Sequence, residues 1–303
     1  MTLQWHSLSA MQDVPAGSVP NLFDSAAWAA AIACLGARCW LGIDRDKNRR
    51  ITLFVWQKGP VRVGYLGFPI SPAWLLTDWD WQSRDSMPLP ERIDLLRWNF
   101  STIGTSVVAS PLGISQPEST IPDLSAWPLR NQRKIRKDLA LGVRHGVTLC
   151  NATIEDVATL FSIYEQTISR HRGRLRYNLD YFKTLTLISA GCEDVQVRLA
   201  RDQQKTIGFC ITVRQADRGY YLHAGVAEGC RHLGAADLLA NDAIRWAISK
   251  NCKSFSMMAS PQDQPGLHKF KQKWSEVDGQ WTTISIPHGV LGRLTKLVLS
   301  LGN

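Results

Sequence analysis

The chain has 303 residues, of which 45% are hydrophobic and 20% charged, so it holds enough apolar material for packed cores and is not a largely disordered protein. This length predicts two domains. The formal net charge is +9: residues 1–127 carry 10 Lys+Arg and 11 Asp+Glu, and the remaining residues carry 25 and 15. The excess positive charge therefore lies in the second part, which predicts an anionic partner for that part.

Cysteine usage and apolar runs exclude further classes of protein. The seven cysteines are scattered and form no Cys-x-x-Cys pair, which is typical of free thiols in a reducing compartment rather than of a disulfide framework or a zinc site. The longest uncharged apolar-rich stretch, residues 25–37, is shorter than the roughly 18 residues needed to cross a bilayer. The first basic residue is Arg38, which argues against a secretory signal. We expect a cytoplasmic protein with no metal.

The first part of the chain predicts helix and strand segments in close succession. The expected elements are a helix, three strands, a second helix and a fourth strand, at 24–35, 39–43, 51–57, 61–68, 91–100 and 105–109. The three closely spaced strands predict an antiparallel meander. The stretch 110–128 is rich in Pro and Ser, and we place the domain boundary at its end, which divides the chain into 1–127 and 128–303.

The second part predicts a mixed sheet covered by helices. Its expected elements are helices at 129–142, 153–167 and 178–188, strands at 195–200, 206–213 and 219–226, a helix at 234–250, a strand at 254–258, a helix at 267–273 and a strand at 281–286. Thr153-x-x-Asp156 has the pattern of a capping box. The tail, 287–303, carries an apolar stripe beside Arg293 and Lys296. We expect it to pack back on the body, with docking on an anionic membrane surface as the alternative.

A turn between a strand and the long helix at 234–250 is the best candidate for binding chemistry. Arg231 opens the turn, Leu233 follows it, and the small residues Gly234, Ala235 and Ala236 lie where the helix begins. Small residues let a ligand approach the unpaired amides of a first helical turn, which favour phosphate groups. An ordinary helix start with incidental small residues is the alternative.

This turn is not isolated. Arg231-x-x-Gly234-x-Ala236 after a strand resembles the acyl-donor phosphate motif of GNAT-type acyltransferases. Downstream, Gly266-x-x-x-Phe270-Lys271, with Trp274 after it, resembles the C-terminal signature of the Fem-type (FemAB-like) branch of that superfamily. The resemblance covers residues 130–303 well and the first part loosely. It implies an α/β (α+β) fold with a mixed, largely antiparallel GNAT-like sheet flanked by helices, in two GNAT-like domains.

The resemblance implies transfer of an acyl or aminoacyl group onto an amine. In Fem-type enzymes the donor is an aminoacyl-tRNA and the acceptor a peptidoglycan precursor, whereas relatives linked to polysaccharide synthesis are assumed to use acyl-CoA. The Arg-x-x-Gly-x-Ala match fits a CoA phosphate clamp and departs from the Fem pattern, so we favour acyl-CoA and keep aminoacyl-tRNA as the alternative. A non-catalytic, GNAT-shaped subunit of a polymer-synthesis complex is a second alternative. No tightly bound cofactor is expected, and the acceptor is expected to be a small or lipid-linked molecule.

Several side chains are candidates for the reaction itself. Lys271 is expected to stabilise negative charge, because the family's Phe-Lys position lies near the transferred group, and Phe270 to contact substrate. His223, Glu228 and Asp263 are the candidate bases, and each has an ordinary structural role as its alternative. Tyr220 and Tyr221 alternate across a strand, and Tyr221 is expected to orient substrate.

An arginine-rich segment follows the helix at 153–167. Arg170, Arg172, Arg174 and Arg176 alternate there with His171 among them, and arginine favours bidentate phosphate contacts. We expect Arg172, Arg174 and Arg176 to meet an anionic group such as a sugar or lipid diphosphate or an RNA backbone. A solvated charged loop is the alternative.

Overall fold

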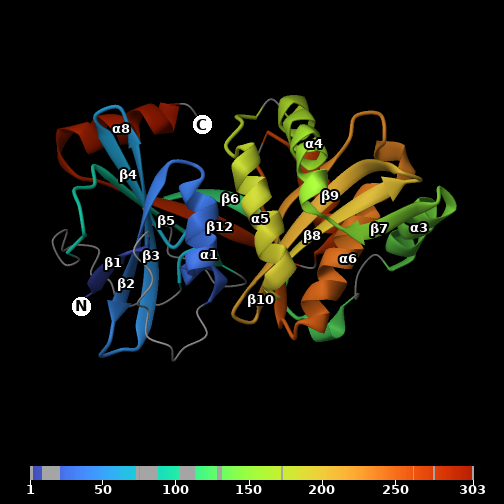
Figure 1. Ribbon diagram of the computed structural model, residues 1–303, viewed down its shortest axis with the longest axis horizontal. Helices are drawn as coiled ribbons and strands as arrows, with labels where there is room; N and C mark the ends of the chain where they lie inside the picture. The colour runs from blue at the N-terminus through green and yellow to red at the C-terminus, as the bar shows by residue number, and fades with distance from the viewer. Residues whose placement is uncertain are drawn as a thin grey trace. The chain divides into compact units, whose positions relative to one another are not determined.

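The computed structural model describes residues 3–8, 21–72, 75, 88–102, 113–127, 132–171, 173–261, 263–275 and 277–301. The chain forms two compact units (Figure 1), and each is described by itself. Unit 1 comprises Met1–Ser115 and Gln280–Asn303, and unit 2 comprises Gln116–Gly279. The sequence predicted one boundary after Trp127, with the C-terminal segment kept in the second domain. The units differ from that division because the last strand and the tail helix return to unit 1.

Unit 1 is built on a sheet with the strand order β1-β2-β3-β4-β5-β12. The strands are β1 (Gln4–Ser7), β2 (Ala37–Asp44), β3 (Arg49–Lys58), β4 (Val61–Leu66), β5 (Leu95–Thr102) and β12 (Val277–Pro287), and the helices are α1 (Ala26–Ala33) and α8 (Gly289–Leu301). The meander predicted from the spacing of β2, β3 and β4 is confirmed, since both of its pairs are antiparallel. Ser25 caps α1 by accepting a hydrogen bond from Trp28 N at 3.1 Å.

The helix predicted at 91–100 is wrong, because this segment forms strand β5. It pairs with β4 in parallel and with β12 antiparallel, along Gln280–Pro287. Leu96, Trp98 and Phe100 alternate along the strand and are all buried. This period of two is the signature of a strand, and the apolar Leu95 beside Leu96 obscured it in the sequence. The strand predicted at 105–109 lies outside the described residues.

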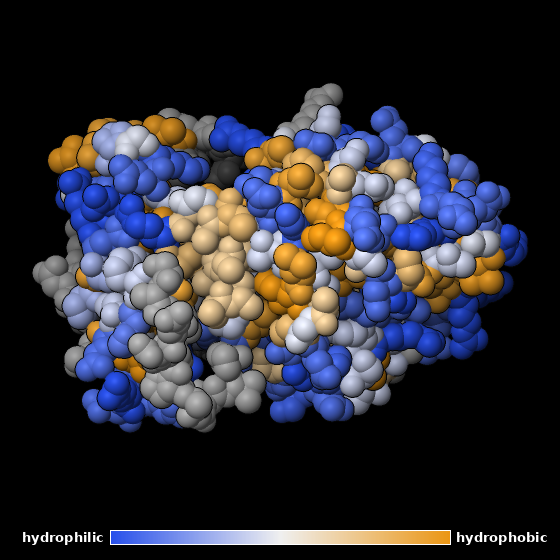
Figure 2. All heavy atoms as spheres, in the orientation of Figure 1, coloured by the Kyte–Doolittle hydropathy of each residue, from blue (hydrophilic) through white to orange (hydrophobic). Residues whose placement is uncertain are grey.

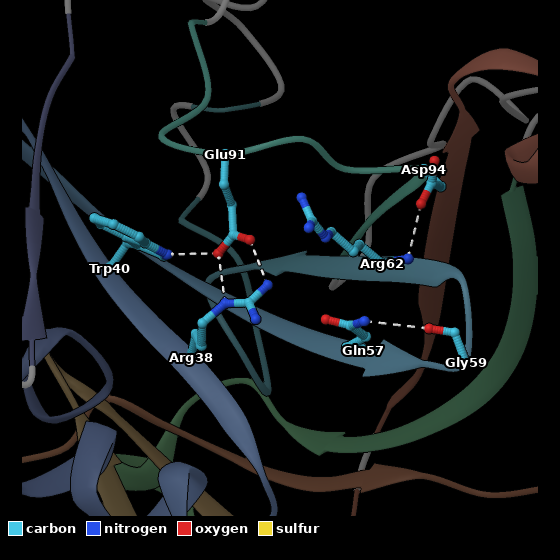
Figure 3. A network of polar contacts seen from close by, with 7 residues as sticks. All are labelled: Arg38, Trp40, Gln57, Gly59, Arg62, Glu91 and Asp94. Atoms are coloured by element: carbon cyan, nitrogen blue, oxygen red, sulfur yellow. Dashed lines mark hydrogen bonds and ion pairs between the residues drawn. The ribbon is translucent and has the colours of Figure 1, made fainter.

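Two carboxylates hold the segment that leads into β5 (Figure 3). Glu91 accepts hydrogen bonds from Arg38 Nε at 3.0 Å and from Trp40 Nε1 at 2.9 Å, both on β2. Asp94 accepts one from the backbone N–H of Arg62, on β4, at 2.8 Å. The pKa of each carboxyl group is lowered, because these partners outweigh the burial that opposes ionisation.

Unit 2 holds the strand order β6-β11-β10-β9-β8-β7. The strands are β6 (Gly113–Ile121, whose first three residues belong to unit 1), β7 (Val147–Asn151), β8 (Val195–Asp202), β9 (Lys205–Gln215), β10 (Arg218–Val226) and β11 (Ser254–Ala259). The helices are α3 (Gln132–Arg144), α4 (Val157–Arg170), α5 (Leu179–Gly191), α6 (Ala235–Ser249) and α7 (Pro265–Trp274). β10 and β11 run parallel, and the pairs β11–β6, β10–β9, β9–β8 and β8–β7 are antiparallel. The predicted fold class, a mixed and largely antiparallel sheet flanked by helices, is confirmed.

The helices of unit 2 cover both faces of its sheet (Figure 1). A Cβ added to Gly219 of β10 would meet Ala247 of α6, and one added to Gly225 would meet Ile163 and Thr167 of α4. α6 therefore packs on one face, and α4 and α5 pack on the other. The helices and strands predicted for this part are confirmed, and so is the capping box that joins Thr153 and Asp156 before α4.

Strand β6 lies inside the Pro/Ser-rich stretch at whose end the domain boundary was expected. Its residues Glu118, Ser119 and Thr120 are polar and nevertheless fully buried. Glu118 accepts a hydrogen bond from Arg218 of β10 at 3.0 Å and a short one from Ser256 of β11. A strand whose buried residues are polar carries no hydrophobic alternation, so periodicity could not reveal it.

Candidate active site

A β-bulge in β10 sets the direction of the side chains at the centre of unit 2. Tyr221 pairs with Thr212 of β9 and His223 with Ile211, so Leu222 is an extra residue between them. One extra residue shifts the alternation, and the next side chain points to the opposite face from the one expected. Tyr221 consequently packs in the α6-side core, and His223 faces α4 and α5.

Strands β10 and β11 pair over only a short distance. The parallel register joins Arg218–Tyr220 to Ser254–Ser256 and does not extend to Tyr221–Val226 within the described residues. Met258, two residues beyond the segment that pairs with β10, has a φ of 62° and lies at an irregularity in the pairing of β11 with β6. The edge of β10 that follows the bulge is therefore available to an extended, amide-bearing ligand that pairs as a strand does.

The turn from β10 into α6 contains a position that only glycine can occupy. Gly234 lies between the short 3₁₀ turn Arg231–Leu233 and α6, with a φ of 78°. A Cβ there would lie 2.7 Å from Gly142 N of α3. Gly234 is therefore required for contact with α3 as well as for its left-handed conformation. The first-turn amides of α6, at Ala235 and Ala236, have no partner inside the helix, which is general for a helix start.

Positive groups gather beside this turn. The Arg170 guanidinium donates to Val226 O at 3.3 Å, and this carbonyl ends β10. Burial, and after it the charge of Arg231, lowers the pKa of Arg170. Burial, with Arg170 and Arg231, also lowers the pKa of His171. Burial is the larger cause of both shifts, and the mutual repulsion of Arg170 and Arg231 adds to it, so an anion bound between these two cations would relieve that repulsion.

The other arginines of the same segment are placed differently. Arg174 and Arg176 are exposed, and the backbone N–H of Arg176 donates to Tyr164 Oη at 3.4 Å. Arg172 lies outside the described residues. Among the arginines of this segment that the structure describes, Arg170 is the one whose guanidinium reaches the end of β10.

Lys271 is buried, and its ammonium group is occupied by backbone carbonyls. Nζ donates to Ala259 O at 2.7 Å and to Met258 O at 3.2 Å, both on β11. Burial lowers the pKa of Lys271 to about 7, although the charge of Glu118 opposes this shift. The expected role of Lys271 was to stabilise charge on a substrate. The observed contacts hold the end of β11, where the left-handed Met258 lies.

Lys273 lies two residues after Lys271 in α7, and its ammonium group links α7 to helices α3 and α6. Its Nζ lies 2.8 Å from Asp138 of α3 and makes a shorter contact with Asp237 of α6. The same ammonium group lies 5.4 Å from the ring centre of Phe270. Phe270, expected to contact substrate, is half-buried and packs against the α6-side core. The basic composition of α7 gave no indication of this buried network.

His223 lies in an aromatic cage. Its ring is surrounded by four aromatic rings from α4, α5 and the segment between them, at Tyr164, Tyr177, Tyr181 and Phe182. Burial lowers the pKa of His223 to about 3, so the imidazole is neutral at physiological pH. An imidazole with so low a pKa is a poor acceptor for an amine proton, which argues against the expected role of His223 as a base. The cage was not predicted, although Tyr177 and Tyr181 are four residues apart and follow the arginine-rich segment directly.

The remaining candidates are placed as follows. Tyr221 is buried beneath α6, and burial raises its pKa well above the ordinary value, so its hydroxyl does not face a ligand as expected. Glu228 is exposed after β10, and its backbone N–H donates to Gln166 at 3.0 Å. Asp263 is exposed in the turn before α7. Neither carboxylate lies on the stretch of β10 that carries the bulge.

Two further features bear on the class of protein. Among the described residues, no group of three or more His, Cys, Asp or Glu side chains is placed to hold a metal ion. No helix in the described ranges combines the length and the apolar character needed to cross a membrane. All seven cysteines are free thiols, which confirms the expectation drawn from their spacing.

Comparison with known proteins identifies the class. Residues 130–272 match the acetyltransferase (GNAT) domain family, which covers the turn at Arg231–Ala236, the bulged strand and most of α7. Residues 130–272 thus carry a GNAT acyltransferase domain, and the chain has a Fem-like fold. A comparison with curated protein sequences found no match.

Solved structures share the fold across both units at low sequence identity. FemX is 13% identical, covers 87% of this chain and 92% of its own, and has a TM-score of 0.57. L-PGS from Bacillus licheniformis is 12% identical over 89% of this chain and 90% of its own, with a TM-score of 0.54. The C-terminal domain of a putative lysylphosphatidylglycerol synthetase from Agrobacterium fabrum is 15% identical over 92% of both chains, with a TM-score of 0.52.

Proposed function

We propose that this acyltransferase moves an acyl group from an acyl-CoA thioester to an amine of a cell-envelope polysaccharide or peptidoglycan precursor. The observation that carries the proposal is the pair of cations, Arg170 and Arg231, that lies with the neutral imidazole of His171 beside the amides that open α6. A pyrophosphate bound there neutralises charges that otherwise repel one another, and it accepts hydrogen bonds from the first helical turn.

The strand geometry supports the same donor. The open edge of β10 after Tyr220 leads from the bulge towards the turn at Arg231. The pantetheine arm of CoA is an extended chain with two amide groups, so it can pair with that edge as a strand would. In this arrangement the diphosphate lies at α6 and the thioester carbonyl lies near the bulge, where a backbone amide of β10 is proposed to stabilise the developing oxyanion.

The acceptor amine is proposed to bind on the α4/α5 side of β10. Tyr181 and His223 form a hydrogen-bonded, uncharged pair there, and the surrounding rings supply apolar contact for a sugar or peptide. Direct attack of a neutral amine on the thioester forms the amide and releases the thiol, and positioning supplies much of the rate. Lys271 is proposed to hold the end of β11 and not to touch the reacting carbonyl, because its ammonium donates to two backbone carbonyls.

A second candidate donor is aminoacyl-tRNA. The structural neighbours include FemX and a putative lysylphosphatidylglycerol synthetase, whose name describes an enzyme that forms a lysyl-bearing phospholipid. A feature of this chain also favours it. Helix α3 exposes four cations on its first turns, at Arg133, Lys134, Arg136 and Lys137. Such a row fits the phosphates of an RNA strand.

The donor is tested by binding and turnover with the purified full-length protein. Calorimetry with CoA and acetyl-CoA is expected to show saturable binding, which Arg170→Gln with Arg231→Gln weakens about tenfold or more, since each charge-assisted phosphate contact is strong. Arg174→Gln is the matched control, because Arg174 belongs to the same segment and is exposed. Release of free thiol in the presence of amino sugars or peptidoglycan peptides then reports transfer.

Each alternative has its own outcome. Failure to bind CoA, with binding of aminoacyl-tRNA that Arg133→Gln and Arg136→Gln abolish, would replace the proposed donor by the second one. RNase treatment and rising salt should then remove the activity. Binding of neither donor would indicate a GNAT-shaped subunit without catalysis.

A further inference from the structure

We propose that helix α8 docks unit 1 on the surface of an anionic lipid bilayer. α8 spans Gly289–Leu301 and lies at the edge of unit 1, against β4 and β5 (Figure 1). A surface helix normally turns its apolar residues inward. This helix presents them to solvent instead.

The exposed apolar residues form one stripe. Val290 is 73% exposed, Leu294 55%, Leu297 56% and Val298 68%. At about 100° per residue, these positions fall within roughly 100° of the helix circumference. Figure 2 shows apolar residues gathered on the surface over α8. Exposed apolar residues are ordinary when single, whereas a contiguous stripe marks an interaction surface.

Close backbone packing fixes this orientation. Gly292 is buried, and a Cβ added to it would lie 1.9 Å from Asp94 O, which precedes β5. The same carbonyl accepts a hydrogen bond from His288 N at 2.7 Å. The glycine side of α8 is therefore the side that contacts the body, and the helix cannot rotate to bury its stripe without losing this contact.

The charges of the helix identify the occupant. Arg293 and Lys296 are the charged residues of Gly289–Leu301, and no acidic residue occurs there. Both lie on the same flank of the stripe, about 60° to 120° from Val290. An apolar stripe bordered by cations fits the boundary between headgroups and acyl chains of an anionic membrane, where long basic side chains reach the phosphates. A protein partner would need matching acidic groups around an apolar groove, which a lipid surface supplies without a specific fit.

Docking would bring the enzyme to acceptors that are anchored in the membrane, a consequence that rests on the proposed function. Binding itself does not depend on catalysis. The two proposals can therefore fail independently, because vesicle binding and thiol release are measured separately.

The test is co-sedimentation of the full-length protein with vesicles of phosphatidylcholine, alone or mixed in equal parts with phosphatidylglycerol. The protein is expected to bind the anionic vesicles, and Leu294→Ser with Val298→Ser should lower its partition about tenfold or more. Arg293→Gln with Lys296→Gln should reduce binding to the level seen with neutral vesicles. Arg293, Leu294 and Val298 are exposed and Lys296 is partly exposed, so the melting temperature is expected to stay nearly unchanged.

Matched controls lie on two other helices. Val143 of α3 is 68% exposed and Leu187 of α5 is 56% exposed, the same exposure as the stripe residues. Val143→Ser with Leu187→Ser should leave vesicle binding unchanged. Equal binding by all variants, or no binding to anionic vesicles, would overturn the proposal. A dimer of the wild type that Leu294→Ser with Val298→Ser dissociates would also overturn it, since a second copy would then be the occupant.

Discussion

The imidazole Nε2 of His223 lies 2.9 Å from the hydroxyl oxygen of Tyr181, and the two residues come from a bulged strand and from the helix packed on it. The bulge places His223 on the α4/α5 face, where aromatic rings surround it. The sequence suggested a catalytic base at His223, whereas the structure shows a mainly apolar site in which His223 and Tyr181 form one hydrogen-bonded pair.

Replacement of His223 by Gln should leave the shape of the pH–rate profile unchanged between pH 5 and pH 8. Burial holds the pKa of His223 at about 3, below its ordinary value of 6.5, so the imidazole does not change charge in that window. The measurement is kcat/KM against pH for the wild type and the variant. An ionisation near pH 6.5 that disappears in His223→Gln would contradict this assignment.

Lys271 should make the free energy of unfolding depend on pH. Burial lowers its pKa from 10.5 to about 7, so between these values the unfolded chain binds a proton that the folded protein has lost. The contribution of this site to stability therefore rises as pH increases from 7 to 10.5, by on the order of 4 kcal/mol. Below pH 7 the cost of burying the charge is fully present.

Denaturant titrations of the wild type and Lys271→Met at several pH values measure this effect. The difference between them should grow in favour of the wild type across that window. Lys269→Met serves as control, because Lys269 is exposed on the same helix. The difference in unfolding free energy between this variant and the wild type should not change across that window. A parallel pair of curves for wild type and Lys271→Met would show that the ammonium is not buried.

Gly234→Ala should destabilise the protein by about 3 kcal/mol. The new Cβ would meet Gly142 of α3, and an alanine at a φ of 78° is itself strained. Thermal melting of Gly234→Ala and Gly266→Ala provides the comparison, since Gly266 in α7 has open space around its Cβ position. Gly266→Ala should be neutral or slightly stabilising. Equal melting temperatures for the two variants would contradict the close contact between α3 and α6.

Lys273→Met should cost about 3 kcal/mol, because it leaves the carboxylates of Asp138 and Asp237 facing each other with no cation between them. Chemical denaturation measures the loss. Lys253→Met is the matched control: Lys253 pairs with Asp217, but both side chains are largely exposed, so little change is expected. A loss for Lys273→Met no larger than for Lys253→Met would mean that the buried network contributes no stability.

Periodicity predicted most elements of unit 2 because their apolar residues recur at the spacing of the element. The capping box at Thr153, the three strands β8, β9 and β10, and helix α6 were all predicted in this way. The motif from Arg231 to Ala236 was placed on the correct turn, since a strand, a short loop and a helix follow one another along the chain. Each of these features depends on residues that are close together in the sequence, so a sequence pattern is sufficient to predict it.

Contacts between segments that are far apart in the sequence determined the features that the sequence did not predict. The apolar run at 95–100 is a strand because β4 and β12 pair with it, and neither partner is near it in sequence. The polar strand β6 is buried because Arg218 and Ser256 satisfy Glu118. One extra residue in β10 turned His223 towards an aromatic cage, and two carbonyls on β11 occupied the ammonium of Lys271. Sequence alone thus determined which local structures form. The direction and protonation of the chemical groups required the tertiary structure, because both depend on neighbours that only folding brings together.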